Sequence, residues 1–308
     1  MIRRAVLLTL AVGAVALGGC SSASSDGDSS TTAPAAATQP TSTTGTQPEA
    51  PDPLDDQTPP PSINGITVQG DTIWIASIAG DEVLQVDRAT GAILARFAAN
   101  GAGPDDVAVA PDGSVWVTGF GNGEVGRIAD GTYEVVTNIA AGINPIDVAD
   151  DGTVYIGTFG PNGSLYRIID DGGFELLATG LPDINGFEVL DDGTIFSPAG
   201  GIAGPGSGVL IDPANGEVTT VADGLPGVAA ATVDPDGQPF LLANATGELI
   251  AVDLEAGTSK VARTIVTGAP FDNLAFAPDG TLYLANFTSV AITAVSPDGD
   301  EQTIAIGS

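Results

Sequence analysis

The chain has no histidine among its 308 residues. Without an imidazole it cannot use Ser-His-Asp catalysis or the proton transfers of histidine-dependent lyases. Its one cysteine, Cys20, excludes an internal disulfide and a zinc site of the cysteine and histidine type. Its glycines lack the spacing of a phosphate-binding loop, which excludes a nucleotide site of that kind.

Basic residues are also scarce. Eight Lys and Arg residues stand against 39 Asp and Glu residues, which gives a formal net charge of −31. A polyanion of this kind repels nucleic acids, so DNA or RNA binding is excluded. Most of the aspartates fall in turn sequences such as Pro111-Asp112-Gly113, where their side chains bond to nearby backbone. The charge is therefore mostly that of a solvated surface.

The first nineteen residues have the pattern of a secretory signal. Arg3 and Arg4 precede an apolar run, 5–17, that is too short to span a bilayer. The run ends in Leu-Gly-Gly-Cys, which resembles a bacterial lipobox. This predicts a lipoprotein signal peptide over 1–19 and a lipidated Cys20 that anchors the protein to the outer face of the cell membrane. The alternative is an ordinary signal peptide cut nearby, which would leave a free thiol.

Residues 20–61 are rich in Ser, Thr, Ala, Pro and Gln and offer almost nothing to bury. Such a segment cannot offset the entropy lost on ordering, so we expect a disordered tether. A flexible coil of about forty residues reaches roughly 35 Å. Its threonines and prolines suit O-glycosylation, and a bare spacer fits them equally well.

The rest of the chain, 62–308, repeats one pattern six times. Each copy holds four short apolar runs separated by turn sequences, and the copies begin at Ile63, Gly103, Asn144, Ile184, Pro226 and Pro270. A period of about forty residues with four strands is typical of a propeller blade. The sequence therefore predicts an all-β fold, a six-bladed β-propeller with four antiparallel strands per blade.

The two ends of this domain suggest how the ring closes. The last apolar run, 303–306, is the predicted outer strand of blade six. If each blade holds its own four strands, no strand is exchanged, and the ring closes by side-chain packing between blades one and six. Trp74 and Trp116 occupy matching second-strand positions, which predicts a place in the core between blades rather than a role in stacking a ligand.

One position of each copy, just before the first strand, falls at the mouth of the central channel. The six residues there are Asn64, Asp105, Asn144, Asn185, Ala229 and Asp272. Five of them carry side-chain oxygens, which are the ligands that Ca²⁺ prefers. A cation would also relieve the repulsion between the two aspartates. The alternative is that Asn and Asp only cap turns before strands.

Further polar residues lie close to the mouth in sequence. They could add ligands or a general base, and they are Asp106, Asp147, Glu188 and Asn273.

The blades resemble those of the SMP-30/gluconolactonase/luciferin-regenerating-enzyme-like family, and also NHL-repeat and streptogramin-lyase propellers. The sequence "DINGFEV" around Asn185 resembles the family's Asn-Gly ligand motif, and "FDNLAFAPDG" around Asp272 resembles its Asp motif. In hydrolytic members a divalent ion, usually Ca²⁺, lies at the channel mouth, and the Asp is the proposed general base. The chain departs from this pattern at Asn64, where the family has Glu, and at Ala229, which offers no ligand.

Three functions remain open. The first is a lipid-anchored, extracytoplasmic, monomeric binding module for a protein, glycan or small molecule, with a divalent cation at the mouth. The alternative is a Ca²⁺-dependent hydrolase of a lactone or ester, in which Asp105, Asn144, Asn185 and Asp272 hold the ion and Asp272 or a neighbouring acid is the base. The third is a structural protein near the cell wall with an empty channel.

Overall fold

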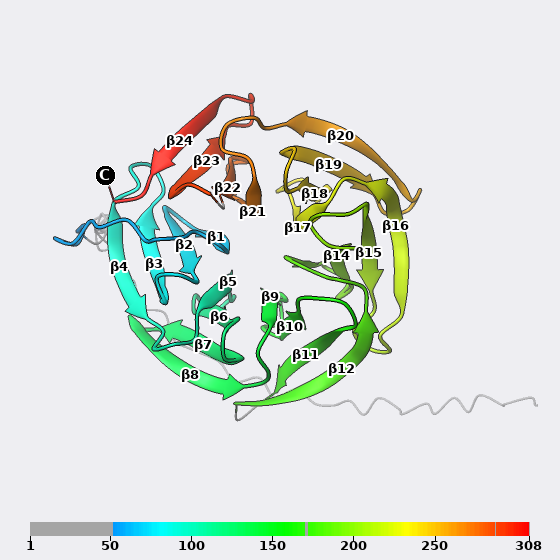
Figure 1. Ribbon diagram of the computed structural model, residues 1–308, viewed down its shortest axis with the longest axis horizontal. Helices are drawn as coiled ribbons and strands as arrows, with labels where there is room; N and C mark the ends of the chain where they lie inside the picture. The colour runs from blue at the N-terminus through cyan, green and yellow to red at the C-terminus, as the bar shows by residue number, and fades with distance from the viewer. Residues whose placement is uncertain (1–51, 170–171, 287, 308) are drawn as a thin grey trace, which may run out of the picture. The chain divides into compact units, whose positions relative to one another are not determined.

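The computed structural model describes residues 52–169, 172–286 and 288–307. These residues form six four-stranded antiparallel sheets arranged around a central axis (Figure 1). The predicted six-bladed β-propeller is therefore confirmed. The predicted signal peptide, Cys20 and most of the predicted tether lie outside the described residues. No helix in the described ranges is long and apolar enough to cross a membrane.

The first three blades follow one another directly along the chain. Blade one comprises β1 (Ile66–Gln69), β2 (Thr72–Ser77), β3 (Glu82–Asp87) and β4 (Ile93–Ala98). Blade two comprises β5 (Pro104–Val109), β6 (Val115–Gly119), β7 (Glu124–Ala129) and β8 (Thr132–Asn138). Blade three comprises β9 (Ile143–Val148), β10 (Val154–Thr158), β11 (Gly163–Ile169) and β12 (Gly173–Leu181).

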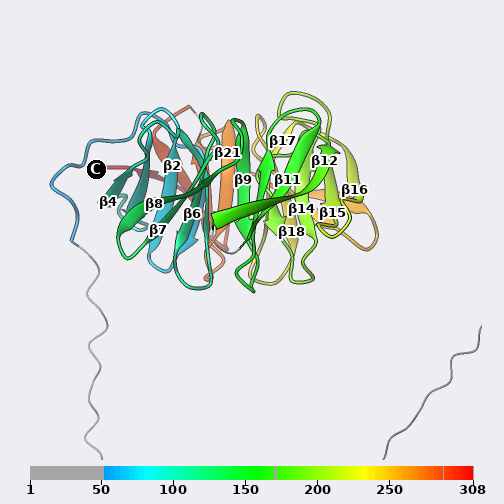
Figure 2. The ribbon, with the colours of Figure 1, turned by 90° about the horizontal axis from the view of Figure 1, so that it is seen from below.

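The last three blades repeat the same order. Blade four comprises β13 (Glu188–Val189), β14 (Ile195–Ala199), β15 (Gly206–Ile211) and β16 (Val218–Leu225). Blade five comprises β17 (Val228–Val233), β18 (Pro239–Ala243), β19 (Glu248–Asp253) and β20 (Thr258–Thr264). Blade six comprises β21 (Phe271–Phe276), β22 (Leu282–Asn286), β23 (Ala291–Val295) and β24 (Glu301–Ala305). In side view, β9 and β21 run roughly along the axis of the ring (Figure 2).

The aspartates of the first turn fix the strand ends in four of the six blades. In blade two, Asp112 accepts a hydrogen bond from the backbone N–H of Ser114 at 3.0 Å, and Gly113 has a φ of +84° that suits glycine. The same bond recurs in blades three, four and six, from Thr153 to Asp151, Thr194 to Asp192, and Thr281 to Asp279. These acids have a conformational role, as their place in the sequence predicts.

The hydrophobic core lies between neighbouring blades. Trp74 of blade one is 6% exposed and packs with Val107 and Val117 of blade two. Trp116 packs in the same way between blades two and three, against Ile146 and Val154. Trp74 thus lies in the core between blades, as the sequence predicts, whereas Trp116 is half-buried at the edge of that core, beneath Arg127.

The ring closes without exchanging a strand. Every sheet takes its four strands from consecutive segments of the chain. One hydrophobic cluster joins Ile73 and Ile75 of blade one to Ile292 and Ile304 of blade six. Each fully buried side chain of this size contributes about 1.5–3 kcal/mol. Side-chain packing therefore closes the seam between blades one and six, as predicted.

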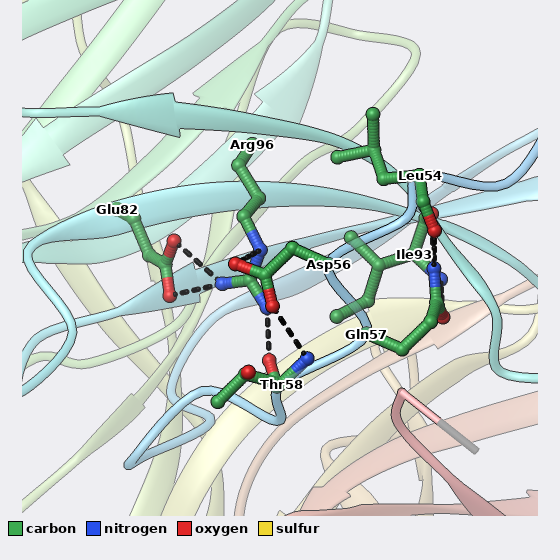
Figure 3. Close-up of polar contacts among 7 residues, drawn as sticks. All are labelled: Leu54, Asp56, Gln57, Thr58, Glu82, Ile93 and Arg96. Carbon is green, nitrogen blue, oxygen red and sulfur yellow. Dashed lines mark hydrogen bonds and ion pairs between the residues drawn. The ribbon is translucent and has the colours of Figure 1, made fainter.

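A short segment, 54–61, lies along the outer strand of blade one, and we call it the strap. The backbone N–H of Leu54 donates to the carbonyl of Ile93 at 2.9 Å. The Gln57 side chain accepts from the Ile93 N–H at 2.9 Å and donates to its carbonyl at 3.0 Å (Figure 3). These residues belong to the predicted tether, but the structure gives them contacts with β4.

Arg96 of β4 holds the strap from the other side. Its Nη1 donates to both carboxylate oxygens of Glu82, at 2.8 and 2.9 Å, and its Nη2 donates to the Thr58 carbonyl (Figure 3). The C-terminal run reaches the same place, since the Gly307 N–H donates to the Gly91 carbonyl at 2.9 Å. The strap and the end of blade six therefore meet on blade one, beside the seam.

Candidate functional site

A β-bulge lies at the channel-mouth position of several inner strands. In β5, Pro104 pairs with Gly119 and Asp106 with Thr118, so Asp105 is an extra residue. Register shifts of the same kind occur in the segments that contain Asn144, Ala229 and Asp272. A bulge breaks strict alternation and re-aims a side chain. The adjacent residues Asp105 and Asp106 are both buried, at 6% and 4% exposed, as are the next residues of β5.

Asp105 is a buried carboxyl without a partner. No residue in the described ranges donates a hydrogen bond to it or pairs with it as a cation. Burial, and then the negative charge of Asp272, raise the pKa of Asp105 to about 8. Burying an ionised group without a partner is costly, so this carboxyl favours either a proton or a bound cation.

Among the described residues, Asp272 has one side-chain hydrogen-bond partner, Asn64. The Asn64 Nδ2 donates to the Asp272 Oδ2 at 3.3 Å. Burial raises the pKa of Asp272 to about 6, and this hydrogen bond opposes the rise. The Asn64 Oδ1 accepts from the Ser62 hydroxyl at 3.1 Å and from the Ile78 N–H at 3.3 Å. Asn64 thus lies with the other mouth residues, but its oxygen, the atom that a metal would need, is already engaged.

Asn144 and Asn185 have unengaged side-chain amides. Their backbone carbonyls are held, that of Asn144 by the Thr118 Oγ1 at 2.6 Å and that of Asn185 by the Ser197 Oγ at 3.4 Å. No hydrogen bond to either side-chain amide is found within the part of the chain that the structure describes. Both amides therefore remain for a ligand, whereas Ala229 is fully buried and offers none.

Asp106 connects three blades below the mouth. It accepts hydrogen bonds from the backbone N–H groups of Val107 at 2.9 Å and Ile146 at 3.3 Å, and from the Asn273 Nδ2 at 2.8 Å. Burial raises the pKa of Asp106 well above its usual range, although the backbone N–H groups oppose this. The sequence suggests Asp106 as a ligand or base, but the structure occupies both its oxygens with contacts between blades.

Asp147 and Glu188 lie deeper in the channel. Asp147 accepts from the N–H groups of Val148 at 2.8 Å and Val189 at 2.7 Å, so it too joins adjacent blades. Burial raises its pKa to about 6. Burial and the nearby Asp147 raise the pKa of Glu188 further above its usual range. With Asp106 and Asn273 these residues line a channel cavity of about 160 Å³.

The donors at the mouth fit a hard cation in kind. Two carboxylates, Asp105 and Asp272, and two amide oxygens, Asn144 and Asn185, are the oxygen ligands that Ca²⁺ prefers. No three Asp, Glu or Cys side chains within the described ranges converge closely enough to hold a metal ion by themselves. A cation at this mouth would therefore depend on the amides and on water as well as on the carboxylates.

Comparison with solved structures shows the same architecture elsewhere. Virginiamycin B lyase from Staphylococcus aureus is 16% identical, with a TM-score of 0.62 over 82% of this chain and 86% of that one. Regucalcin from Agrobacterium tumefaciens, a calcium-binding protein, is 19% identical, with a TM-score of 0.59 over 74% of this chain and 83% of that one. A putative gluconolactonase is 15% identical, with a TM-score of 0.60 over 80% of this chain and 92% of that one.

These neighbours are all six-bladed β-propellers. This chain has the same fold. At such low sequence identity the likeness establishes the fold alone. No protein-family model matches the sequence, and no curated protein matches it either.

Two residues that shape the mouth were not among the candidates from the sequence. Thr118 is fully buried; it accepts from the Asp106 N–H at 3.2 Å and donates to Asn144. Gly65 lies so close to blade two that a Cβ there would be 2.5 Å from the Asp106 Cα. The Asn64-Gly65 dipeptide repeats at Asn185-Gly186, which is the one sequence signal that could have drawn attention to this glycine.

Proposed function

We propose that this protein binds a divalent cation, with Ca²⁺ as the candidate, at the mouth of its propeller channel. The bound cation would hold an oxygen-bearing ligand outside the cell membrane, to which a lipid on Cys20 would anchor the protein. The observation that carries this proposal is the Asp105 carboxyl, which is 6% exposed and has neither a hydrogen bond nor a cation among the described residues.

The surroundings of Asp105 support a cation rather than another ligand. Asp272 places a second carboxyl close enough to raise the pKa of Asp105 by its charge. The amides of Asn144 and Asn185 add neutral oxygens, and no mouth position carries Lys or Arg. A divalent cation would offset the like charges and would draw on all four side chains.

A second candidate is hydrolysis of a lactone or ester. The fold shared with a putative gluconolactonase favours it, as does Asp272, whose pKa of about 6 lets it take up a proton near neutral pH. A bound divalent cation would polarise the substrate carbonyl and lower the pKa of a bound water. Asp272 would then accept the proton from that water, and Asn64 would hold the Asp272 carboxylate in place.

Thermal unfolding of the full chain, first in EDTA and then with increasing Ca²⁺, tests the cation. A ligand that binds only the folded state stabilises it by about 2.7 kcal/mol at a hundredfold excess over Kd. We expect a saturable rise in Tm that is lost in Asp105→Ala, which removes the ligating oxygens, and kept in Asp192→Ala, a control in an exposed turn. No rise in the unmodified protein, or the same rise in Asp105→Ala, would refute the proposal.

The anchor has a separate test. Growth of the producing cells with labelled palmitate should label the protein and place it in the membrane fraction. A Cys20→Ser variant should carry no label and leave that fraction. An unlabelled wild-type protein would overturn the anchor without affecting the cation site.

A further inference from the structure

A hydrogen bond crosses in front of blade one, directly below the mouth. The Nδ2 of Asn273, on the inner strand of blade six, donates to the Oδ1 of Asp106, on the inner strand of blade two, at 2.8 Å. The two residues are 167 positions apart in the sequence, and both line the channel cavity. The bond therefore connects two blades that are not neighbours in the ring.

Blade one makes room for this bond by having a glycine at the matching position. A Cβ on Gly65 would lie 2.5 Å from the Asp106 Cα and 2.6 Å from its Oδ1, so any side chain would displace Asp106. The Gly65 N–H also donates to the Asp105 carbonyl at 2.6 Å. Here the glycine is required by the close approach of blade two.

The bond joins the residues next to the two candidate carboxylates. Asp106 follows Asp105, and Asn273 follows Asp272. Asp106 also accepts from the N–H of Ile146, two residues after Asn144. Movement of blade two relative to blade six would therefore change the separation of Asp105 and Asp272 and stretch the bond from Asn273 to Asp106.

We propose that Asn273 and Asp106 are positioning residues that fix the distance between the Asp105 and Asp272 carboxylates, and thereby select the size of the cation. This inference rests on the proposed cation site. Ca²⁺ accepts oxygen ligands at about 2.3–2.6 Å in flexible geometry, whereas Mg²⁺ requires about 2.0–2.1 Å in a near-ideal octahedron. A bond that fixes the positions of the two inner strands limits how far the Asp105 and Asp272 carboxylates can adjust. Such a site meets the flexible geometry of Ca²⁺ more easily than the near-ideal octahedron of Mg²⁺, so it favours Ca²⁺.

Calorimetric titration of the full chain with Ca²⁺ and with Mg²⁺ tests the role of the bond. The unmodified protein should prefer Ca²⁺, and Asn273→Ala should reduce the ratio of the two affinities by about tenfold. Gly65→Ala should reduce it as well, because it displaces Asp106. If Asn273→Ala fails to fold, Asn273→Leu, which is close to asparagine in shape, lacks the amide donor and adds no charge, takes its place.

If the bond from Asn273 to Asp106 only stabilised the fold, its loss would lower the stability and leave the ratio of the Ca²⁺ and Mg²⁺ affinities unchanged. Ile304→Val, which lowers stability at the seam, serves as the control and should keep the ratio of the unmodified protein. An unchanged ratio in both Asn273 and Gly65 variants would refute this inference and leave the cation site standing. An unmodified protein that binds neither ion would refute the proposed function and this inference with it.

Discussion

The Gln57 side chain forms hydrogen bonds with both backbone groups of Ile93. It accepts from the Ile93 N–H at 2.9 Å and donates to the Ile93 carbonyl at 3.0 Å, as a neighbouring strand would. Ile93 begins the outer strand of blade one, whose other edge residues have no further strand beside them. The Gln57 side chain therefore covers the exposed edge of the sheet where the two ends of the propeller meet.

Truncation of Gln57 should weaken this junction. Gln57→Ala would leave the N–H of Ile93 to water, while the Ile93 carbonyl would keep the bond from the Leu54 N–H. We expect the free energy of unfolding to fall by about 0.5–1.5 kcal/mol. Denaturant unfolding of the full chain measures this. Gln302→Ala is the matched control, because Gln302 lies exposed on the outer strand of blade six. Equal losses in the two variants would show that the strap does not stabilise the ring.

The stability of the metal-free protein should fall as pH rises. Asp105 has a folded-state pKa of about 8 against an ordinary value of 3.8. Between these values the folded state holds a proton that the unfolded state has lost, so unfolding is favoured increasingly as pH rises through the window. The loss should run from about pH 4 to about pH 8, and Asp272, with a pKa of about 6, should add to its lower part.

Urea unfolding in EDTA over this pH range measures the effect. Asp105→Asn, which keeps the shape and removes the titration, should flatten the upper part of the curve. Asp192→Asn removes an acid from an exposed turn and should leave the curve unchanged. Parallel curves for the wild type and Asp105→Asn would contradict the raised pKa of Asp105.

Removal of the Thr118 hydroxyl should lower both the stability of the protein and its affinity for Ca²⁺. Its hydroxyl accepts from the Asp106 N–H at 3.2 Å and donates to the Asn144 carbonyl at 2.6 Å. Thr118→Val keeps the shape but leaves both groups unpaired in a buried place, which should cost about 1–3 kcal/mol. Since Asn144 is then free to shift, Ca²⁺ affinity should fall too. Thr118→Ser keeps the hydroxyl and should keep the affinity, and a Val variant that matched Ser in affinity would refute the coupling.

The sequence predicts the ring because its turns repeat. The Asp-Gly turns fix the ends of strands locally, and aligning them identifies one residue per blade at the mouth, including Asp105 and Asp272. The seam follows from the same repeat, since each copy carries four apolar runs. These features depend on residues close together in the chain.

The features that the sequence did not predict depend on contacts between distant segments. Strict alternation places Asp105 and Asp106 on opposite faces of a strand, whereas the bulge in β5 makes Asp105 an extra residue and changes the direction of its side chain. The orientation of the Asn64 amide is set by Ile78 and Asp272, which no local pattern reveals. The sequence of the strap resembles that of a tether, because the backbone groups that bind Gln57 belong to Ile93, far from it in the chain.

If the protein is a hydrolase, the substitution Asp272→Asn should lower turnover without abolishing Ca²⁺ binding. Asp272→Asn keeps an amide oxygen that can still ligate a cation but removes the carboxylate that would accept a proton. Loss of a general base lowers the rate by about 10²–10⁴-fold. We therefore expect lactone or ester hydrolysis at saturating Ca²⁺ to fall by that factor, while the Ca²⁺-induced rise in Tm is largely kept. Asp192→Asn should retain full turnover. The contrary outcome is that the unmodified chain shows the rise in Tm but no turnover across a panel of lactones and esters. The cation and both carboxylates would then be in place without any reaction. That outcome would contradict the hydrolase candidate and leave the cation-binding proposal standing.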